Sequence, residues 1–235
     1  MEKQIIIPTI NAQRLLKDIK QIMCNPLTDN GIYYRHDDKD MLKGYALIIG
    51  PEDTLYEYGA YLFEFNFPPN YPFEPPRVVF KTNNGETRFN PNLYKNGKVC
   101  ISILNTWRGD QWSSCQNIST ILLTLVTLLN NKPFLNEPGV TEQHSSYNDY
   151  NKIIRYENLN FSILKFLNKE YYPNGFKDFH DIFVKLIKEK RDVIKHKITT
   201  FMNKEKKETL VVPFYQMRVT INYESLFNKF NKIDI

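Results

Sequence analysis

The chain of 235 residues has only three cysteines and no apolar run long enough to span a membrane. Cys24, Cys100 and Cys115 are an odd number without paired spacing, which argues against a disulfide framework and a cysteine zinc site. The apolar run within residues 1–10 is too short for a secretory signal and carries an acid. We therefore expect a cytoplasmic or nuclear protein with no metal site and no membrane partner.

Histidine is also scarce, and the four in the chain are His36, His144, His180 and His196. A cysteine protease lowers the pKa of its nucleophile with a neighbouring histidine. None of the four lies in a motif typical of a general base. The sequence therefore argues against a strongly activated pair of cysteine and histidine.

The net charge of +5 comes largely from lysines after residue 160. No motif that reads RNA or DNA accompanies this charge, so we expect no nucleic-acid partner. A solvated basic face is the first interpretation, and steering toward an acidic protein is the second. With 42% hydrophobic residues, the chain can fill the core of one large domain or of a domain with an appendage.

Residues 11–24 have the apolar spacing of an amphipathic helix, with Thr9 or Asn11 as candidate caps. The face opposite the apolar one is basic and consists of Arg14, Lys17 and Lys20. From spacing alone, this face is best interpreted as solvated.

Strand patterns follow at residues 44–49, 59–67 and 77–81, and their short connections predict an antiparallel meander. A loop with five prolines precedes the last of these strands and carries Phe73. An aromatic ring on a stiff loop suits partner recognition, whereas a ring folded back over the core is the equal alternative.

Helical patterns occupy residues 118–130, 147–167, 176–203 and 222–233, and Asn117 or Ser119 is expected to cap the first. We expect a core domain over residues 1–168. Residues 169–235 are expected to form a helical extension packed on this core, because their apolar faces must be buried.

Cys100 follows an asparagine-rich loop and lies within a short apolar run. It is either a buried cysteine at the end of a strand or a nucleophile presented by the loop. Asn90, Asn92 and Asn96 can each donate to an oxyanion or form a turn, and Asn96 before Gly97 favours the turn. Composition and spacing leave the choice for Cys100 open.

Asn90-Pro91-Asn92, placed eight residues before Cys100 with a turn between them, resembles the active-site signature of the ubiquitin-conjugating enzymes. The order of elements over residues 11–167 resembles this family as well. The resemblance implies an α+β, UBC-like fold with an N-terminal helix, a four-stranded antiparallel meander sheet and following helices. The longer loop after Cys100 and the C-terminal tail resemble a large subgroup, one member of which handles both ubiquitin and a modifier of two ubiquitin-like folds.

The resemblance also implies catalytic roles. Cys100 would carry the thioester, and Asn92 would support the oxyanion or the loop. Glu137 would desolvate, orient or deprotonate the incoming lysine. Asn90 replaces the histidine of the usual motif, whose role is mainly structural, and is expected to support the loop.

Two surfaces for partners are implied in the same way. Arg14, Lys17 and Lys20 match the basic helix face that docks the activating enzyme. Phe73 and the loop with Ser114 and Cys115 match ligase contacts. Most family members have Pro-Ala in place of Ser114-Cys115, so this departure argues against ordinary RING or HECT recognition.

The sequence thus predicts a ubiquitin-conjugating enzyme. It accepts ubiquitin or a ubiquitin-like modifier from an activating enzyme as a thioester on Cys100. It then passes the modifier to a substrate lysine, with or without a RING or HECT ligase. No cofactor is expected, because the upstream activating enzyme uses the ATP. The alternative is a catalytically weak or inactive binding module of the same fold within a ubiquitin-signalling complex.

Overall fold

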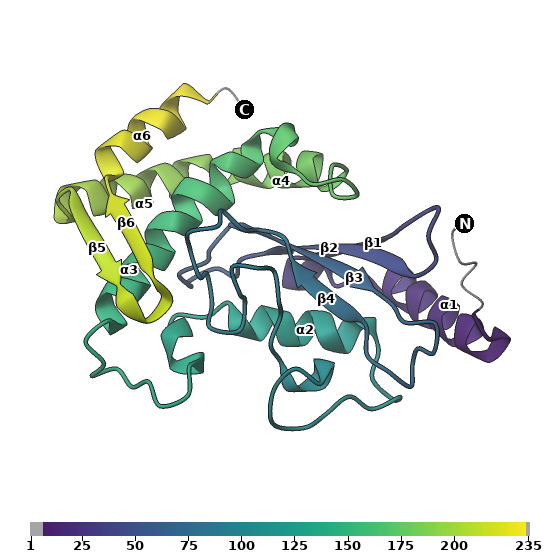
Figure 1. Cartoon of the computed structure of the whole chain (residues 1–235). Helices are drawn as coiled ribbons and strands as arrows, with labels where there is room; N and C mark the ends of the chain where they lie inside the picture. The colour runs from purple at the N-terminus through teal and green to yellow at the C-terminus, as the bar shows by residue number, and fades with distance from the viewer. Residues whose placement is uncertain (1–6, 234–235) are drawn as a thin grey trace, which may run out of the picture.

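The computed structural model describes residues 7–233, and an antiparallel sheet lies at its centre (Figure 1). The four strands β1 (Ile32–His36), β2 (Lys43–Ile49), β3 (Ala60–Asn66) and β4 (Arg77–Phe80) are adjacent in sequence order. The predicted meander and the α+β class are confirmed. The apolar pattern had identified three of the strands and missed β1, whose residues Tyr33 to His36 are only half-buried.

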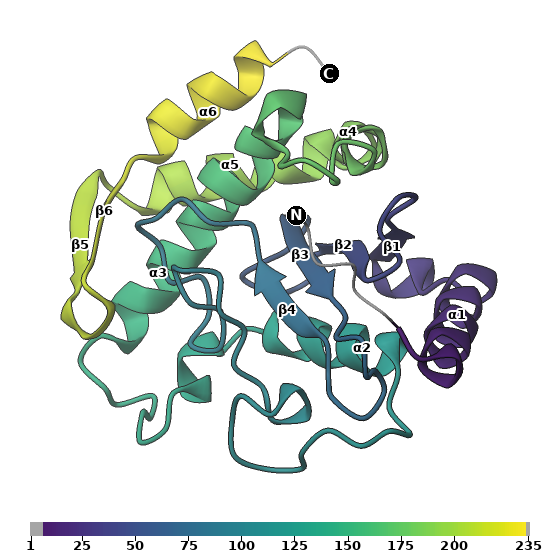
Figure 2. The ribbon, with the colours of Figure 1, turned by 45° about the vertical axis from the view of Figure 1, so that its right-hand side comes forward.

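Helices cover both faces of this sheet. Figures 1 and 2 show α2 (Ile118–Leu128) on one side and α4 (Phe179–Glu189) with α5 (Arg191–Lys204) on the other. Successive residues Leu62 and Phe63 of β3 point to opposite faces, and both are fully buried. The sheet therefore has no solvated face at this position.

The first helix, α1 (Thr9–Cys24), begins two residues before the predicted start. The predicted caps are wrong, because Pro8 occupies the cap position and no side chain accepts a hydrogen bond there. Asn11 is buried inside the helix and donates through Nδ2 to the carbonyl of Tyr71, 2.9 Å away. The cap of α2 is confirmed, since Asn117 accepts from the backbone N–H of Thr120.

The helix predicted over residues 147–167 is not regular throughout. It runs as α3 (Tyr147–Glu157), continues in a wide π-helical segment, Asn158–Ile163, and ends in a short 3₁₀ turn. Asn158 lies at the start of the π segment, donates to the carbonyl of Glu57 at 2.9 Å and accepts from the hydroxyl of Tyr61 at 2.7 Å. These buried bonds to β3 and to the connection that precedes it accompany the change in helix geometry.

One long helix over residues 176–203 was also predicted, and this is wrong. The chain breaks at Lys190, with φ −99° and ψ 6°, and forms α4 and α5. Because of the break, α4 packs over the sheet while α5 lies beside the last helix, α6 (Tyr223–Lys232). Each of the two pieces buries its own apolar stripe.

The tail is not purely helical, as had been expected. A hairpin of β5 (Glu208–Val212) and β6 (Met217–Ile221) lies beside α3 (Figure 1). Its turn has no glycine, and Gln216 takes the left-handed backbone conformation with φ +51°. Hairpin turns usually place Gly, Asn or Asp at such positions, so the sequence offers no local signal for this one.

The tail packs directly on the sheet. The ring of Phe176 lies 5.0 Å from that of Tyr45 on β2, and Asp178 forms an ion pair with Arg35 on β1. Leu47 of β2 is on the same face as Tyr45 and is fully buried. Apolar side chains of the tail and of the sheet belong to one cluster. The predicted domain division after residue 168 stays a prediction.

Within residues 7–233, no helix is both long and apolar enough to cross a membrane. In the same part of the chain, no group of His, Cys, Asp or Glu side chains has the arrangement of a metal site. Most of the apolar run within residues 1–10, in which the sequence argues against a secretory signal, lies outside the described residues.

Candidate active site

Asn92 and Cys100 are joined by two hydrogen bonds across the asparagine-rich loop. The backbone N–H of Cys100 donates to the carbonyl of Asn92 at 2.9 Å. The side-chain amide of Asn92 donates to the carbonyl of Cys100 at 2.6 Å. Two roles were expected for Asn92, and this geometry supports the one in which it holds the loop. Its role toward an oxyanion stays a prediction.

Asn90 is fully buried and connects three segments. Its amide nitrogen donates to the carbonyl of Leu128 at the end of α2, at 2.8 Å. Its oxygen accepts from the backbone N–H of Asn92 at 2.9 Å and from the amide of Asn136 at 3.3 Å. These contacts are those expected of a residue that supports the loop.

Asn96 lies in a turn, in agreement with the preferred interpretation. Its side-chain oxygen accepts from the backbone N–H of Lys98 at 3.0 Å. Gly97 has φ +86°, a backbone conformation that side chains with a Cβ rarely adopt. Asn96 is therefore occupied in shaping the turn before Cys100.

Cys100 is buried, with 3% of its surface exposed. Its thiol donates to the carbonyl of Thr106 at 2.8 Å. Burial raises the pKa of the Cys100 thiol, while the positive charges of Lys98 and Arg88 lower it in part. The thiol is thus mainly protonated at neutral pH and needs access and deprotonation before it reacts.

Alkylation should show this difference between the cysteines. At pH 7 we expect iodoacetamide to modify Cys100 at least about tenfold more slowly than the exposed Cys24 and Cys115. Because the pKa of Cys100 is raised, its rate should grow about tenfold per pH unit through the neutral range. Mass spectrometry of each cysteine peptide over time measures the rates. If Cys100 were modified faster than Cys24 and Cys115 at pH 7, its thiol could not be buried as described.

Glu137 directly follows the 3₁₀ turn Pro133–Asn136, and Asn136 binds Asn90 in the Cys100 loop. The negative charge of Glu137 is close enough to raise the pKa of Cys100 slightly further. The structure therefore brings the three predicted catalytic residues, Asn92, Cys100 and Glu137, into one region.

Sequence reasoning missed two residues of this region, Arg88 and Tyr215. The guanidinium of Arg88 donates to the carbonyls of Asn90 and Pro91 and lies 3.4 Å from the centre of the Tyr94 ring. Tyr215, from the tail, places its ring 5.0 Å from the same guanidinium and donates its hydroxyl proton to Glu137. No motif predicts a contact between residues so far apart in the chain.

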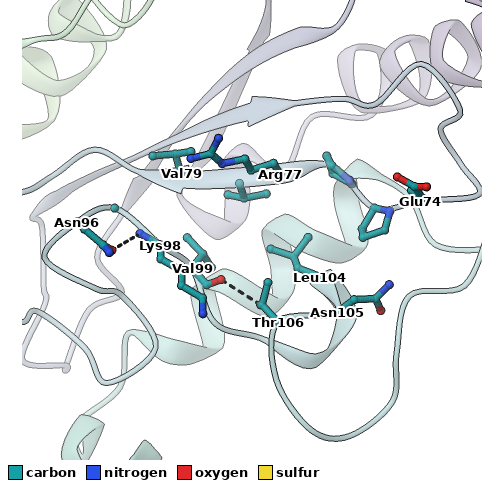
Figure 3. A pocket seen from close by; sticks show the side chains of 13 residues that line it. Glu74, Arg77, Val79, Asn96, Lys98, Val99, Leu104, Asn105 and Thr106 are labelled. Carbon is teal, nitrogen blue, oxygen red and sulfur yellow. Dashed lines mark hydrogen bonds between the residues drawn. The ribbon is translucent and has the colours of Figure 1, made fainter.

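A cavity of about 680 Å³ lies next to the loop, between β4 and the segment that contains Cys100 (Figure 3). Val79 of β4, Lys98 and Thr106 line it. The carbonyl of Thr106 also accepts the thiol proton of Cys100. Thr106 is therefore shared between the lining of the cavity and the surroundings of the thiol.

The basic face of α1 is only partly free. Lys17 and Lys20 are exposed, whereas Arg14 binds Asp18 and donates to the carbonyls of Ser114 at 2.6 Å and Gln116 at 2.8 Å. The interpretation of this face as solvated is therefore wrong for Arg14. This residue joins α1 to the loop that contains Cys115.

The two segments expected to contact ligases lie next to each other. Phe73 is 70% exposed, so the alternative of a ring folded over the core is wrong. The indole N–H of Trp112 donates to the carbonyl of Pro72 at 2.7 Å and connects this loop to exposed Ser114 and Cys115. Ligase contact itself stays a prediction.

Comparison with known proteins identifies the family of this chain. The family model described as ubiquitin-conjugating enzyme matches residues 14–174. The chain belongs to the ubiquitin-conjugating enzyme family, and the predicted class of enzyme, a thioester-forming transferase, is confirmed.

Three relatives illustrate the similarity. The ubiquitin-conjugating enzyme E2 Z of Xenopus tropicalis is 34% identical over 94% of this chain and 70% of its own length. The human E2 Z is 44% identical over 64% of this chain, which spans only 43% of that relative. A probable ubiquitin-conjugating enzyme of Caenorhabditis elegans is 38% identical over 67% of this chain and 24% of its own length. All three names favour an enzyme over an inactive binding module.

Proposed function

We propose that Cys100 is the residue that carries the modifier. Its thiolate attacks the thioester carbonyl of the charged activating enzyme, a new thioester forms on Sγ, and the activating enzyme's thiol leaves. A substrate lysine amine then attacks this carbonyl, an isopeptide bond forms, and the Cys100 thiolate is released while the amine loses a proton. The observation that carries this proposal is the double hydrogen bond between Asn92 and Cys100 beside Glu137.

This chemistry is compatible with a thiol whose pKa is raised. Exchange between two thioesters changes little in bond energy, so it does not need a strongly activated cysteine. The harder step is attack by the amine, which must be oriented and must lose a proton. Glu137, whose charge is felt at Cys100, is the acidic residue proposed for that step, and we expect it to affect discharge and not charging.

A charging assay tests the assigned site. The protein is incubated with activating enzyme, ATP and ubiquitin, and the expected product is an adduct that thiol reductants remove. Cys24→Ser and Cys115→Ser serve as matched controls and should charge like the unaltered protein. A Cys100→Ser variant that still formed a thiol-sensitive adduct would show that Cys100 is not the carrier.

Glu137→Ala should separate charging from discharge. We expect transfer from Cys100 to free lysine to slow by about 10²-fold, the usual contribution of a positioned acid or base, while charging changes less than about twofold. Single-turnover assays of the two steps give the two rates. Equal slowing of both steps would remove Glu137 from this role.

The specific partners belong to the same proposal. Lys17 and Lys20 offer the exposed cations for an activating enzyme, and Phe73, Ser114 and Cys115 offer the surface for a RING or HECT ligase. The modifier is ubiquitin or a ubiquitin-like protein, and charging with a panel of activating enzymes identifies it. The reaction takes place in the cytoplasm or nucleus and uses no cofactor, nucleic acid or membrane.

A further inference from the structure

The turn of the tail hairpin reaches the predicted active site. Between β5 and β6 the chain forms a 3₁₀ turn, Pro213–Tyr215, followed by Gln216 in the left-handed conformation. From this turn the hydroxyl of Tyr215 donates to Oε2 of Glu137. A residue of the tail thus touches the one carboxylate expected to act on the incoming lysine.

Several contacts hold the turn against the Cys100 loop. The backbone N–H of Arg88 lies 3.0 Å from the sulfur of Met217, and Nζ of Lys95 donates to the carbonyl of Gln216 at 3.3 Å. The centre of the Tyr215 ring lies 5.0 Å from the Arg88 guanidinium and 5.8 Å from the centre of the buried Phe134 ring. Tyr215 is therefore packed against two side chains of the core.

The base of the hairpin is anchored as well. Leu210 and Val212 are buried, and Glu208 forms an ion pair with Lys152 of α3 at 3.0 Å. Figure 2 shows the hairpin lying along α3. The position of the Tyr215 hydroxyl thus follows from the packing of the β5–β6 hairpin on the core.

The chemistry of the pair is that of a donor and an acceptor. Burial and the neighbouring Glu137 carboxylate raise the pKa of Tyr215, so the phenol keeps its proton at neutral pH. A phenol that donates to a carboxylate oxygen forms a charge-assisted hydrogen bond, which is stronger than one between neutral groups and restrains that oxygen. Within residues 7–233, Oε1 of Glu137 makes no hydrogen bond, so the second oxygen can accept from an amine.

We propose that Tyr215 is a positioning residue for lysine transfer, acting through Glu137, and that the C-terminal tail thereby completes the active site. This inference rests on the proposed function of Cys100 and Glu137. Tyr215 holds the Glu137 carboxylate toward the thioester, so its effect belongs to discharge and depends on the presence of that carboxylate.

A double-mutant cycle tests the inference. Tyr215→Phe keeps the ring and removes the hydroxyl. Tyr147→Phe is the matched control, because Tyr147 is a half-buried tyrosine whose hydroxyl makes no hydrogen bond to any residue of 7–233. Each change is made in the unaltered chain and in the Glu137→Ala chain. Charging with ubiquitin, single-turnover discharge to free lysine and melting temperature are measured for each protein.

We expect Tyr215→Phe to slow discharge about tenfold, in line with the loss of one hydrogen bond to a charged group, and to leave charging unchanged. In the Glu137→Ala chain the same substitution should change discharge less than about twofold. Tyr147→Phe should alter neither step in either chain. A melting temperature within a few degrees of the unaltered protein shows that the fold is retained.

Two results would overturn the inference alone. The first is a Tyr215→Phe protein that charges normally and discharges to lysine at the same rate as the unaltered protein. The other is the same slowing in the presence and in the absence of Glu137, which would mean a general structural effect of the hydroxyl. An unaltered protein that failed to charge with any activating enzyme would instead overturn the proposed function, and this inference with it.

Discussion

Cys100→Lys should convert the transient adduct into a permanent one. In this variant the lysine amine accepts ubiquitin as an isopeptide, which thiol reductants do not cleave. Cys100→Ala has no nucleophile at the position, and we expect its charging to fall by at least about 10³-fold. Electrophoresis with and without reductant, after incubation with activating enzyme, ATP and ubiquitin, distinguishes the three proteins.

Cys24→Ala and Cys115→Ala are the controls for this experiment. Both cysteines are exposed, but neither lies beside the asparagine-rich loop, so we expect neither substitution to change charging. The decisive comparison is with Cys115, which lies outside the asparagine-rich loop. Suppose that Cys100→Ala still formed a reductant-sensitive adduct and that the double variant Cys100→Ala/Cys115→Ala did not. The thioester would then have to be assigned to Cys115 and not to Cys100.

Phe176→Ala should produce a large loss of unfolding free energy. Phe176 is fully buried, and its ring packs on Tyr45 of the central sheet. Removing a buried phenylalanine side chain costs about 3–5 kcal/mol of unfolding free energy. For a chain of this size, that loss corresponds to a fall in melting temperature on the order of 10 °C. Thermal and urea unfolding measure the two quantities.

Phe214→Ala is the matched control in the same tail, because the ring of Phe214 is 52% exposed. We expect it to cost about 1 kcal/mol or less. If both substitutions cost the same small amount, the tail would be a loosely attached appendage, and the burial of Phe176 against the sheet would not contribute to folding.

Local patterns explain what the sequence could predict. The alternation around Phe63 and Phe65 and the cap at Asn117 depend on neighbours within a few residues. The spacing from Asn92 to Cys100 is set by a short loop closed by two hydrogen bonds. Such features can be read from a single segment, and the structure agrees with them.

The errors have a different physical origin. A single residue, Lys190, ends α4, although the apolar stripe continues on both sides of it. The β5–β6 turn places Gln216, not glycine, at a positive φ. In both cases tertiary packing outweighs the local preference, and packing is not visible in the order of the letters.

Contacts between residues far apart in the chain could not be predicted from the sequence either. Arg14 had the spacing of a solvated helix face, yet its guanidinium binds backbone carbonyls about one hundred residues later in the chain. Tyr215 had no motif at all, and only the fold places its hydroxyl on Glu137. The sequence could indicate Cys100, Glu137 and the asparagines Asn90 and Asn92, but not Arg88 and Tyr215.

The contacts of residues 215–217 with the Cys100 loop also concern the order in which the protein is made. The chain leaves the ribosome from its N-terminus, so Asn92, Cys100 and Glu137 emerge well before Tyr215 and Met217. Until the hairpin has emerged and folded, Glu137 lacks its phenol partner and the backbone N–H of Arg88 lacks its contact with Met217. If Tyr215 acts through Glu137 as proposed, we expect efficient lysine transfer only after the whole chain has been synthesised and the hairpin has folded against the Cys100 loop.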